Sequence, residues 1–299
     1  MAVIATGFFD GVHPGHRLVI DTLLAESRDR GEESVAVTFW PHPRAVLQNG
    51  ADSLRYLTSR SERVSLLRSL GVDEVVTVPF TRQFAALSTE DYLKMLCRDY
   101  QCTALVLGYD TRFGAAQEGP EGIAAAARRL GLGVTVTPPV CSSDGIPVSS
   151  SRIRTALEAG DAVLAGELLG RPYSLSGVVV AGNRIGRTIG FPTANMKLYE
   201  PLMLIPKPGV YRTRVQVLGS EYDGITNIGV RPTVSGSGEL TIETHIIGFD
   251  EMIYGLDISI AFISRIRDER RFPSIDALRE QLQKDMATVT PPSSLPLKK

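Results

Sequence analysis

The pattern of apolar residues changes once along this chain of 299 residues, close to residue 170. Before that point, short apolar runs such as 2–5 and 34–39 alternate with amphipathic stretches of about ten residues. This alternation predicts βαβ units, and therefore an α/β domain with a parallel sheet and helices on both faces. After that point, strand-like segments follow one another with only short turns between them. We therefore expect a small antiparallel β-barrel in the second half.

The expected domains are 1–170 and 171–290, followed by a proline- and serine-rich tail over 291–299 that is predicted to be disordered. Strands of the second domain are expected over 174–181, 209–218, 239–247 and 256–266. Turns between them are expected at Asn183, Gly219, Asp223–Gly224 and 235–238. A terminal helix capped by Ser274 closes the domain, and its stripe of apolar residues is expected to be buried: Ile275, Leu278, Leu282 and Met286.

Two helices of the first domain are expected to begin at N-cap serines. Ser59 stands three residues before Glu62, which is the spacing of a capping box, and Ser88 stands three residues before Asp91. A further short helix is expected over 155–158. These positions agree with the alternation of strands and helices.

Charge and cysteine content narrow the classes of function. The formal net charge is −1, which argues against general electrostatic binding to nucleic acid or to an anionic membrane. We see no apolar run as long as a membrane span and no basic region of a signal peptide. The three cysteines have no C-x-x-C spacing, which indicates reduced thiols and a cytoplasmic protein. The oligomeric state is not predicted.

A glycine- and histidine-rich segment, T-G-F-F-D-G-V-H-P-G-H over 6–16, stands between the first strand and the first helix. Glycines allow a ligand to approach the backbone, and a helix N-terminus presents free N–H groups and a partial positive charge to phosphates. His13 and His16 are three residues apart, so both can face one polyphosphate and stabilise charge that develops on it. The alternatives are a metal-binding pair or ordinary surface histidines.

A second candidate phosphate site is V-S-S-S-R-I-R over 148–154, at the start of a helix. Hydroxyl groups and N–H groups can donate hydrogen bonds to phosphate oxygens, and an arginine fork can bind two of them. The alternative is a serine-capped helix with a solvated basic face. A third segment, 182–195, has glycines at every fourth residue and is neither a Walker loop nor a Rossmann fingerprint. Its pattern alone indicates a flexible, mildly basic loop that can wrap an anion.

The first half resembles a known family. G-F-F-D-G-V-H-P-G-H is similar to the signature of the nucleotidyltransferase superfamily, and in fuller form to the FMN adenylyltransferase module of bacterial FAD synthetases. Segment 108–114 resembles the family's G-x-D-F-x-F-G element, and 149–154 its I-S-S-T-x-I-R element. Thr111 stands where the family usually has Phe, and 115–118 lacks the basic residues often found there.

The resemblance implies a Rossmann-like nucleotidyltransferase domain and a set of site residues. Charge at the transferred phosphate would be stabilised by His13, His16 and Arg154. His42, in a turn similar to the family's T-F-x-P-H-P, would lie on the flavin side. The implied nucleotide-binding residues are Gly7, Phe8, Asp10, His13, His16, Gly108, Asp110, Ser149, Ser150, Ser151 and Arg154.

The second half resembles riboflavin kinases, whose hallmark is similar to G-R-T-I-G-F-P-T-A-N over 186–195. The resemblance implies that Thr193 and Asn195 hold Mg²⁺ with ATP, since neutral oxygens suit this cation. Further nucleotide-binding residues implied are Gly182, Gly186, Arg187, Gly190 and Pro192. Tyr254–Gly255 also matches the family, whereas Gly248 stands where it often has Asp.

The catalytic base implied by the family's V-E-x-H strand is Glu243. The segments N-I-G-V-R-P-T over 227–233 and R-D-E-R-R-F over 267–272 resemble family elements as well. The flavin-binding residues they imply are Asn227, Arg267 and Glu269. From the strand pattern alone, Glu243 is better explained as an outward-facing polar residue.

Taken together, the motifs predict a bifunctional transferase with Mg²⁺ as cofactor. The second domain would phosphorylate riboflavin to FMN with ATP, and the first would adenylylate FMN to FAD with release of pyrophosphate. Two alternatives stay open. One is a flavin-binding or kinase protein whose adenylyltransferase module is inactive, and the other is an adenylyltransferase of another phosphorylated substrate. Riboflavin, FMN and ATP are the predicted small-molecule partners, with no nucleic acid and no membrane.

Overall fold

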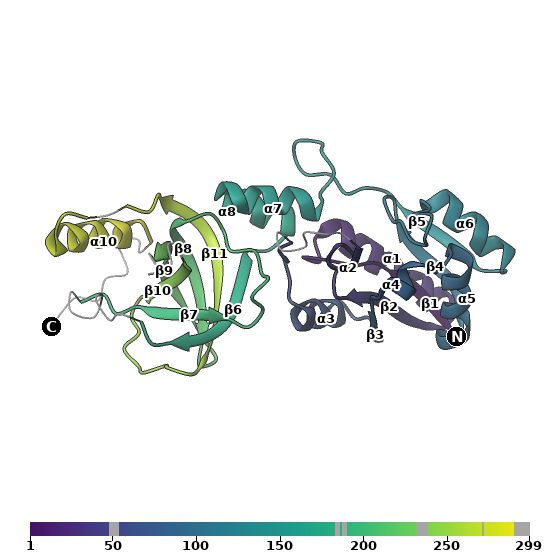
Figure 1. Cartoon of the computed structure of the whole chain (residues 1–299), viewed down its shortest axis with the longest axis horizontal. Helices are drawn as coiled ribbons and strands as arrows, with labels where there is room; N and C mark the ends of the chain where they lie inside the picture. The colour runs from purple at the N-terminus through teal and green to yellow at the C-terminus, as the bar shows by residue number, and fades with distance from the viewer. Residues whose placement is uncertain (48–53, 183–185, 187–189, 232–238, 271, 290–299) are drawn as a thin grey trace. The chain divides into compact units, whose positions relative to one another are not determined.

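The computed structural model of the chain describes residues 1–47, 54–182, 186, 190–231, 239–270 and 272–289 (Figure 1). Its contacts divide the chain into two compact units, Met1–Ser150 and Ser151–Lys299. The functional boundary predicted at residue 170 stays a prediction, and the tail predicted over 291–299 lies outside the described residues.

The first unit is built on a five-stranded parallel sheet in the order β3-β2-β1-β4-β5. Its strands are β1 (Ala2–Thr6), β2 (Glu33–Trp40), β3 (Glu74–Pro79), β4 (Cys102–Gly108) and β5 (Gly133–Thr137). Its helices are α1 (Pro14–Arg30), α2 (Pro43–Leu47), α3 (Arg60–Ser69), α4 (Arg82–Ala85), α5 (Thr89–Tyr100) and α6 (Pro120–Arg129). The parallel sheet predicted from the alternating pattern is therefore confirmed.

Helices cover both faces of this sheet (Figure 1). Val3 and Ala5 of β1 pack with apolar residues of α1 and α3, whereas Ala2 and Ile4 pack with those of α5 and α6. Successive side chains of a strand point to opposite faces, so the central strand is apolar on both faces from Ala2 to Ala5, and its last residue, Thr6, shares a hydrogen bond with the Tyr92 hydroxyl. All five residues of β1 are buried. This places the carboxyl end of β1 at the centre of one sheet edge, where ligands of such sheets bind.

Both predicted N-caps are confirmed. Ser59 and Glu62 form the capping box of α3, and the Ser88 side chain accepts a hydrogen bond from the backbone N–H of Asp91 in α5. The short helix expected over 155–158 is wrong in extent, because α7 runs from Ser150 to Ala159. Its first turn therefore contains two of the three motif serines.

The second unit contains a closed barrel in the order β10-β7-β6-β11-β8-β9, which confirms the predicted architecture. Its elements are α7 (Ser150–Ala159), α8 (Ala162–Leu169), β6 (Tyr173–Val180), β7 (Ala194–Leu198), β8 (Gly209–Val217), β9 (Ser220–Arg231), β10 (Glu239–Ile246), β11 (Asp257–Arg267) and α10 (Ile275–Val289). Two of these strands, β7 and β9, were not among the four expected from the sequence.

The turn expected at Asp223–Gly224 is wrong, since both residues lie inside β9 and pair with β8. A Cβ atom at Gly224 would lie 2.7 Å from Cγ2 of Val215, so this glycine permits close packing rather than a reversal of the chain. The reversal predicted at Gly219 is confirmed. Leu218 and Gly219 form a two-residue loop with φ angles of 50° and 76°, as hairpins with a matching twist require.

The barrel interior contains a row of hydroxyl groups besides its apolar side chains. Thr226 of β9 exchanges hydrogen bonds of 2.9 Å with Thr213 of β8 and with Thr244 of β10. All three residues are fully buried. A hydroxyl can both donate and accept, so Thr226 can bridge the other two, and each hydroxyl of the row has a partner within the barrel.

The terminal helix α10 is held on the barrel mainly by a buried ion pair. Arg267 of β11 donates to both carboxylate oxygens of Asp285, at 2.8 to 3.1 Å. Ser274 caps α10 as predicted, by accepting a hydrogen bond from the Ala277 N–H. The burial predicted for Ile275 is wrong, since 58% of this residue is exposed. It lies in the first turn, whereas the contacts with the barrel are made by the last two turns.

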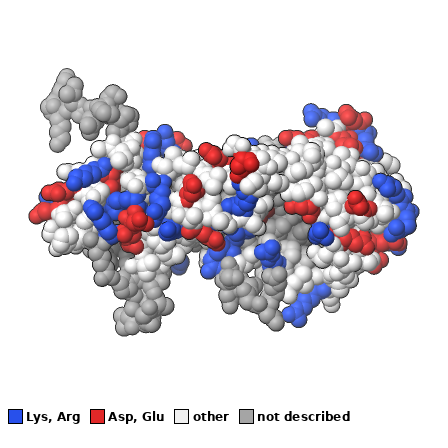
Figure 2. Space-filling model, turned by 90° about the horizontal axis from the view of Figure 1, so that it is seen from above, with Lys and Arg blue, Asp and Glu red and all other residues white. Residues whose placement is uncertain are grey.

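Both signs of charge are interspersed over the face of the molecule in Figure 2, in keeping with the formal net charge of −1. Among the described residues, no helix is long and apolar enough to cross a membrane.

Asp285→Ala should lower the free energy of unfolding of the second unit by about 3 kcal/mol, because it leaves the half-buried Arg267 without its counter-charge. The double variant Arg267→Met with Asp285→Leu should recover most of that loss. Asp276→Ala, on the exposed side of α10, is the matched control. Urea unfolding followed by circular dichroism measures the effect, and Trp40 fluorescence reports the first unit separately. Equal losses of unfolding free energy in Asp285→Ala and Asp276→Ala would contradict this prediction.

Candidate functional site

The turn after β1 has an unusual backbone. Phe9, Gly11 and Val12 all have positive φ angles, of 55°, 83° and 43°. For a β-branched residue such as Val12 this conformation is a true outlier, and it costs on the order of 1–3 kcal/mol. Strain of this kind persists only where surrounding contacts enforce it, and it is concentrated at functional sites.

Asp10 holds this turn in its strained conformation through hydrogen bonds. Its carboxylate accepts hydrogen bonds from the backbone N–H groups of Leu57 and Thr58 and from the Thr58 hydroxyl, at 3.0 to 3.1 Å. The Thr58 hydroxyl in turn accepts a hydrogen bond from the Gly11 N–H. Only 3% of Asp10 is exposed. Asp10 therefore holds the turn in place, and a direct contact with a nucleotide stays a prediction.

The two motif histidines lie at the N-terminus of α1. His13 occupies the N-cap position, Pro14 is the first helical residue, and the ring centroids of His13 and His16 are 3.7 Å apart in a stacked arrangement. Phe9 packs its ring edge-on against His16. The helix N-terminus and two imidazole rings thus converge on one place, as a site for phosphate groups requires.

Burial lowers the pKa of His16 well below its ordinary value of 6.5, and the charges of His13 and Arg63 lower it further. His16 is therefore neutral at physiological pH. A neutral imidazole can still donate one hydrogen bond to a phosphate oxygen. It cannot contribute a permanent positive charge unless an anion first raises its pKa.

The second phosphate motif meets the first at Ser150, whose hydroxyl donates a hydrogen bond of 2.9 Å to the Asp10 carbonyl. The preceding Ser149 is half-buried. The structure therefore brings these serines to the glycine- and histidine-rich turn, although about 140 residues separate them in the sequence. Ser151 and Arg154 lie in α7 within the second compact unit, and their part in this site stays a prediction.

Two further predicted elements follow neighbouring strands of the sheet. Gly108 ends β4, next to β1, and Asp110 lies in the turn after it. His42 follows β2 on the other side of β1, with its ring 4.2 Å from that of Phe8. The Phe8 carbonyl is itself held by the hydroxyl of Thr38. Because the carboxyl ends of parallel strands share one sheet edge, these residues flank the histidine turn from both sides.

In the barrel, three residues from three different motifs share one row. Glu243 of β10 lies directly opposite Asn195 of β7 and directly opposite Asn227 of β9. Residues opposite each other in antiparallel strands point their side chains to the same face, about 5 Å apart. All three are half-buried. The predicted base thus lies between a predicted metal ligand and a predicted flavin contact.

Glu269 extends this row, whereas Arg267 is engaged elsewhere. A Cβ atom on Gly229 would overlap the Glu269 carboxylate and would lie 3.1 Å from the Asn227 amide nitrogen. Glu269 therefore lies over Gly229, beside Asn227. The Arg267 guanidinium is bound by Asp285, so its predicted flavin contact stays a prediction.

The glycines of segment 182–195 have a packing reason. A Cβ atom on Gly182 would overlap the Asn195 side chain, and one on Gly186 would overlap the Phe191 carbonyl. Both glycines thus let the segment fold back on its own P-T-A-N end. Gly190 has a φ of 83°, and Arg187 lies outside the described residues.

The side-chain oxygens of Thr193 and Asn195, with Glu243 beside them, suit a hard cation that takes further ligands from water and phosphate. Among the described residues, no three His, Cys, Asp or Glu side chains gather as a metal site. The chemistry of the pair therefore fits Mg²⁺ bound together with a nucleotide.

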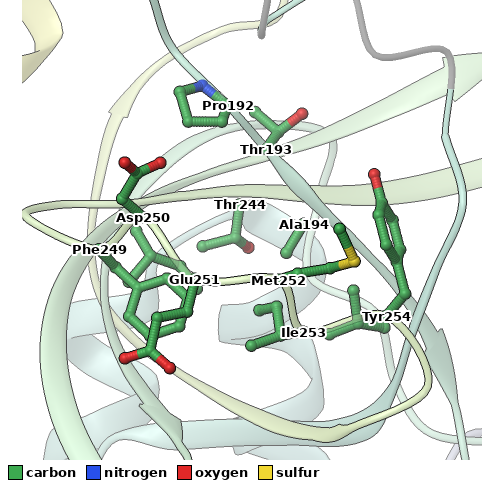
Figure 3. Close-up of a pocket in the computed structure, with 12 residues that line it drawn as sticks. Pro192, Thr193, Ala194, Thr244, Phe249, Asp250, Glu251, Met252, Ile253 and Tyr254 are labelled. Atoms are coloured by element: carbon green, nitrogen blue, oxygen red, sulfur yellow. The ribbon is translucent and has the colours of Figure 1, made fainter.

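A pocket opens beside Thr193, and sequence reasoning largely missed it (Figure 3). The residues around it are Val179, Pro192, Thr193, Ala194, Thr244, Ile246 and 249–254. One lining residue, Pro192, is held by a contact of 2.8 Å between its carbonyl and the Nδ1 of His245. Only Tyr254 had been singled out in the loop 249–254, because the other five residues carry no local motif.

Comparisons with known proteins cover both units. The FAD synthetase family model matches residues 1–152, and the riboflavin kinase family model matches residues 169–291. A bifunctional riboflavin kinase/FMN adenylyltransferase of Bacillus subtilis is 35% identical, over 95% of this chain and 90% of its own length. The protein of the same name from Escherichia coli K12 is 37% identical, over 96% and 91%.

The chain belongs to this bifunctional family.

A crystal structure of a Streptococcus pneumoniae protein, described as a macrolide-efflux protein, also matches, with a TM-score of 0.90 and 32% identity over 96% of this chain and 93% of that one. Within the bifunctional family, the turn at His13 and His16 falls in the part matched by the FAD synthetase model. The row at Glu243 falls in the part matched by the riboflavin kinase model. Each site is thus confined to one family module.

The lowered pKa of His16 predicts a pH dependence of stability. The unfolded chain binds a proton on this histidine below about pH 6.5, whereas the folded chain does not until a lower pH. The stability that His16 contributes is therefore complete above pH 6.5 and is lost as the pH falls below it. Between pH 7 and pH 5, the melting temperature of the first unit should fall less in His16→Asn than in wild type.

Trp40 fluorescence follows melting of the first unit, and His245→Asn in the barrel is the control. Equal pH slopes for wild type and His16→Asn would contradict the assignment.

Proposed function

We propose that this chain catalyses two successive reactions on flavins. The barrel transfers the γ-phosphate of ATP to riboflavin and forms FMN, and the parallel-sheet unit transfers the adenylyl group of ATP to FMN and forms FAD and pyrophosphate. The observation that carries this proposal is the coincidence of two built sites with two family modules. One is the histidine turn pinned by Asp10, and the other is the row of Asn195, Glu243 and Asn227.

In the kinase reaction, Glu243 accepts the proton of the riboflavin 5′-hydroxyl while the hydroxyl oxygen attacks the γ-phosphorus of ATP, and ADP leaves. Its neighbours on the row hold the reactants: Asn195 and Thr193 on the nucleotide side, and Asn227 and Glu269 on the flavin side. Thr193 and Asn195 would hold Mg²⁺, which would neutralise charge at the transferred phosphate when bound.

The pocket beside Thr193 is the place that we assign to the nucleoside of ATP. It is lined by the Met252, Ile253 and Tyr254 side chains, and by Thr193 and Thr244 among its polar residues (Figure 3). Apolar walls with a few polar groups suit a flat heterocycle that must be both buried and oriented.

In the adenylyl transfer, a phosphate oxygen of FMN attacks the α-phosphorus of ATP, and pyrophosphate leaves. No covalent intermediate with the chain is required, so catalysis rests on positioning and on neutralising charge. His13, His16 and the N-terminus of α1 donate hydrogen bonds to the phosphates. Ser149, Ser150, Ser151 and Arg154 are assigned to the same phosphates, and Gly108 and Asp110 to the nucleoside.

A cytoplasmic location stays a prediction.

The experiment that tests the proposal is a time course of products from riboflavin, ATP and Mg²⁺, with the flavins separated by chromatography. FMN should appear first and FAD second. FMN without FAD, also when FMN is supplied, would mean that the adenylyltransferase module is inactive. Absence of both products from folded chain would overturn the proposal. Adenylylation of a phosphorylated substrate other than FMN would then be tested.

Two single variants should separate the activities. His16→Ala should lower the rate of FAD formation from supplied FMN by roughly 10²-fold or more, since a hydrogen bond to the transferred phosphate is lost, and leave the kinase rate unchanged. Glu243→Gln should abolish riboflavin phosphorylation and leave FAD formation from FMN unchanged. Each variant is thus the folding control of the other. A full kinase rate in Glu243→Gln would remove this residue as the base.

A further inference from the structure

Arg63 of α3 is a charged side chain that the motifs do not account for. It is fully buried, and its Nη2 donates a hydrogen bond of 3.2 Å to the Phe39 carbonyl at the end of β2. Among the described residues, its Nε and Nη1 have no hydrogen-bond acceptor. A buried guanidinium with unused donors is costly to maintain, so its presence calls for a functional reason.

The guanidinium lies against the aromatic residues of the adenylyltransferase site. Its Cζ is 4.0 Å from the ring centre of Phe8 and 5.7 Å from that of Trp40. Phe8 is half-buried, and its ring centre lies 4.2 Å from that of His42. Tyr56 packs against Trp40, with ring centres 5.0 Å apart. We call Phe8, Trp40, His42 and Tyr56 the aromatic floor, and Arg63 lies beneath it.

Arg63 retains its positive charge at neutral pH. Burial lowers its pKa to about 10, with attraction by Asp10 and Tyr56 opposing this and repulsion by Arg60 adding to it. The Asp10 carboxylate already accepts hydrogen bonds from Leu57 and Thr58, so it only partly neutralises this charge. Because the surroundings have a low dielectric constant, the remaining field acts over a longer distance than that of a surface arginine.

The position of the aromatic floor in the sheet indicates which substrate it serves. It lies at the ends of β1 and β2, whereas Gly108 and Asp110, assigned to the nucleoside, follow β4 on the other side of β1. Two substrates that react over the end of β1 must occupy opposite sides of this switch point. With the nucleoside of ATP assigned to the β4 side, the floor on the β2 side is left for the phosphorylated flavin.

We infer that Arg63 is a positioning residue for the phosphorylated flavin of the adenylyl transfer: it fixes the Phe8 ring of the aromatic floor and supplies a buried positive charge to this anionic substrate. The inference rests on the proposed function. It explains why FMN rather than riboflavin is held there, since the cation favours a ligand that carries a phosphate. The serines and Arg154 are assigned to ATP, so Arg63 serves the attacking phosphate instead.

The test is a steady-state comparison of FAD formation from supplied FMN in Arg63→Met, Arg63→Lys and wild type. Arg63→Met should raise the KM for FMN about tenfold or more, while the KM for ATP changes less than about twofold. Arg63→Lys, which keeps the charge, should recover a large part of the FMN affinity. The riboflavin kinase rate of the same preparations shows that the barrel is intact.

Arg68→Met is the matched control, because Arg68 lies on the same helix but is exposed. It should leave both Michaelis constants unchanged. A general loosening of the site by the Arg63 substitutions would raise both constants together, and that result would overturn the inference, as would unchanged constants in Arg63→Met.

If Arg63→Met forms no FAD at all, the Michaelis constants of Arg63→Lys test the inference instead. A KM that is raised in Arg63→Lys for FMN alone supports the inference. Equal changes in the KM for FMN and the KM for ATP, or no change in either, overturn it. Wild-type chain that forms no FAD from FMN would remove the proposed function, and this inference with it.

Discussion

The hydrogen bonds of Asp10 to the segment at Leu57 and Thr58 are the constraint on which the first site depends. They hold a turn that contains Val12 in a left-handed conformation, and that turn delivers His13 to the N-terminus of α1. The same residue offers its carbonyl to Ser150. One residue, through its carboxylate and its backbone carbonyl, thus positions two predicted phosphate-binding elements without needing to contact a phosphate. The negative charge of the Asp10 carboxylate is tolerable near a proposed phosphate site because backbone N–H groups donate hydrogen bonds to it.

The two sites of the chain are built by different means. The proposed adenylyltransferase site consists of turns after strands, and each turn needs its own supports, such as Asp10 for the histidine turn and Arg63 for Phe8. The proposed kinase site consists of side chains on paired strands, where the ladder itself sets the spacing of Asn195 and Glu243. Turns can surround a substrate, whereas strands give fixed distances between reacting groups.

The sequence predicted the parallel sheet and the barrel, because both depend on local periodicity, whereas the roles of the motif residues stay predictions. It failed where a residue's role is set by a distant partner. Asp223–Gly224 has the composition of a turn. Gly224 is nevertheless a strand residue whose missing side chain leaves room for Val215 on the neighbouring strand. For Arg267, no local pattern indicated the ion pair with Asp285, which lies 18 residues away on a helix; the flavin contact predicted for Arg267 stays a prediction. Arg63 follows a capping box, which gives no sign that the next side chain is buried beneath an aromatic ring.

The shared row of Asn195, Glu243 and Asn227 also limits how this chain can vary over evolution. Successive residues of a strand face opposite sides. One inserted or deleted residue in the middle of β10 would therefore move the side chains of the rest of that strand to the opposite face of the barrel wall. Glu243 would then face the barrel interior in place of Thr244, and the buried hydroxyl row would be broken in the same event. Point substitutions can accumulate along these strands, but changes in their length cannot. Length variation among functional descendants should therefore be confined to the connections between strands.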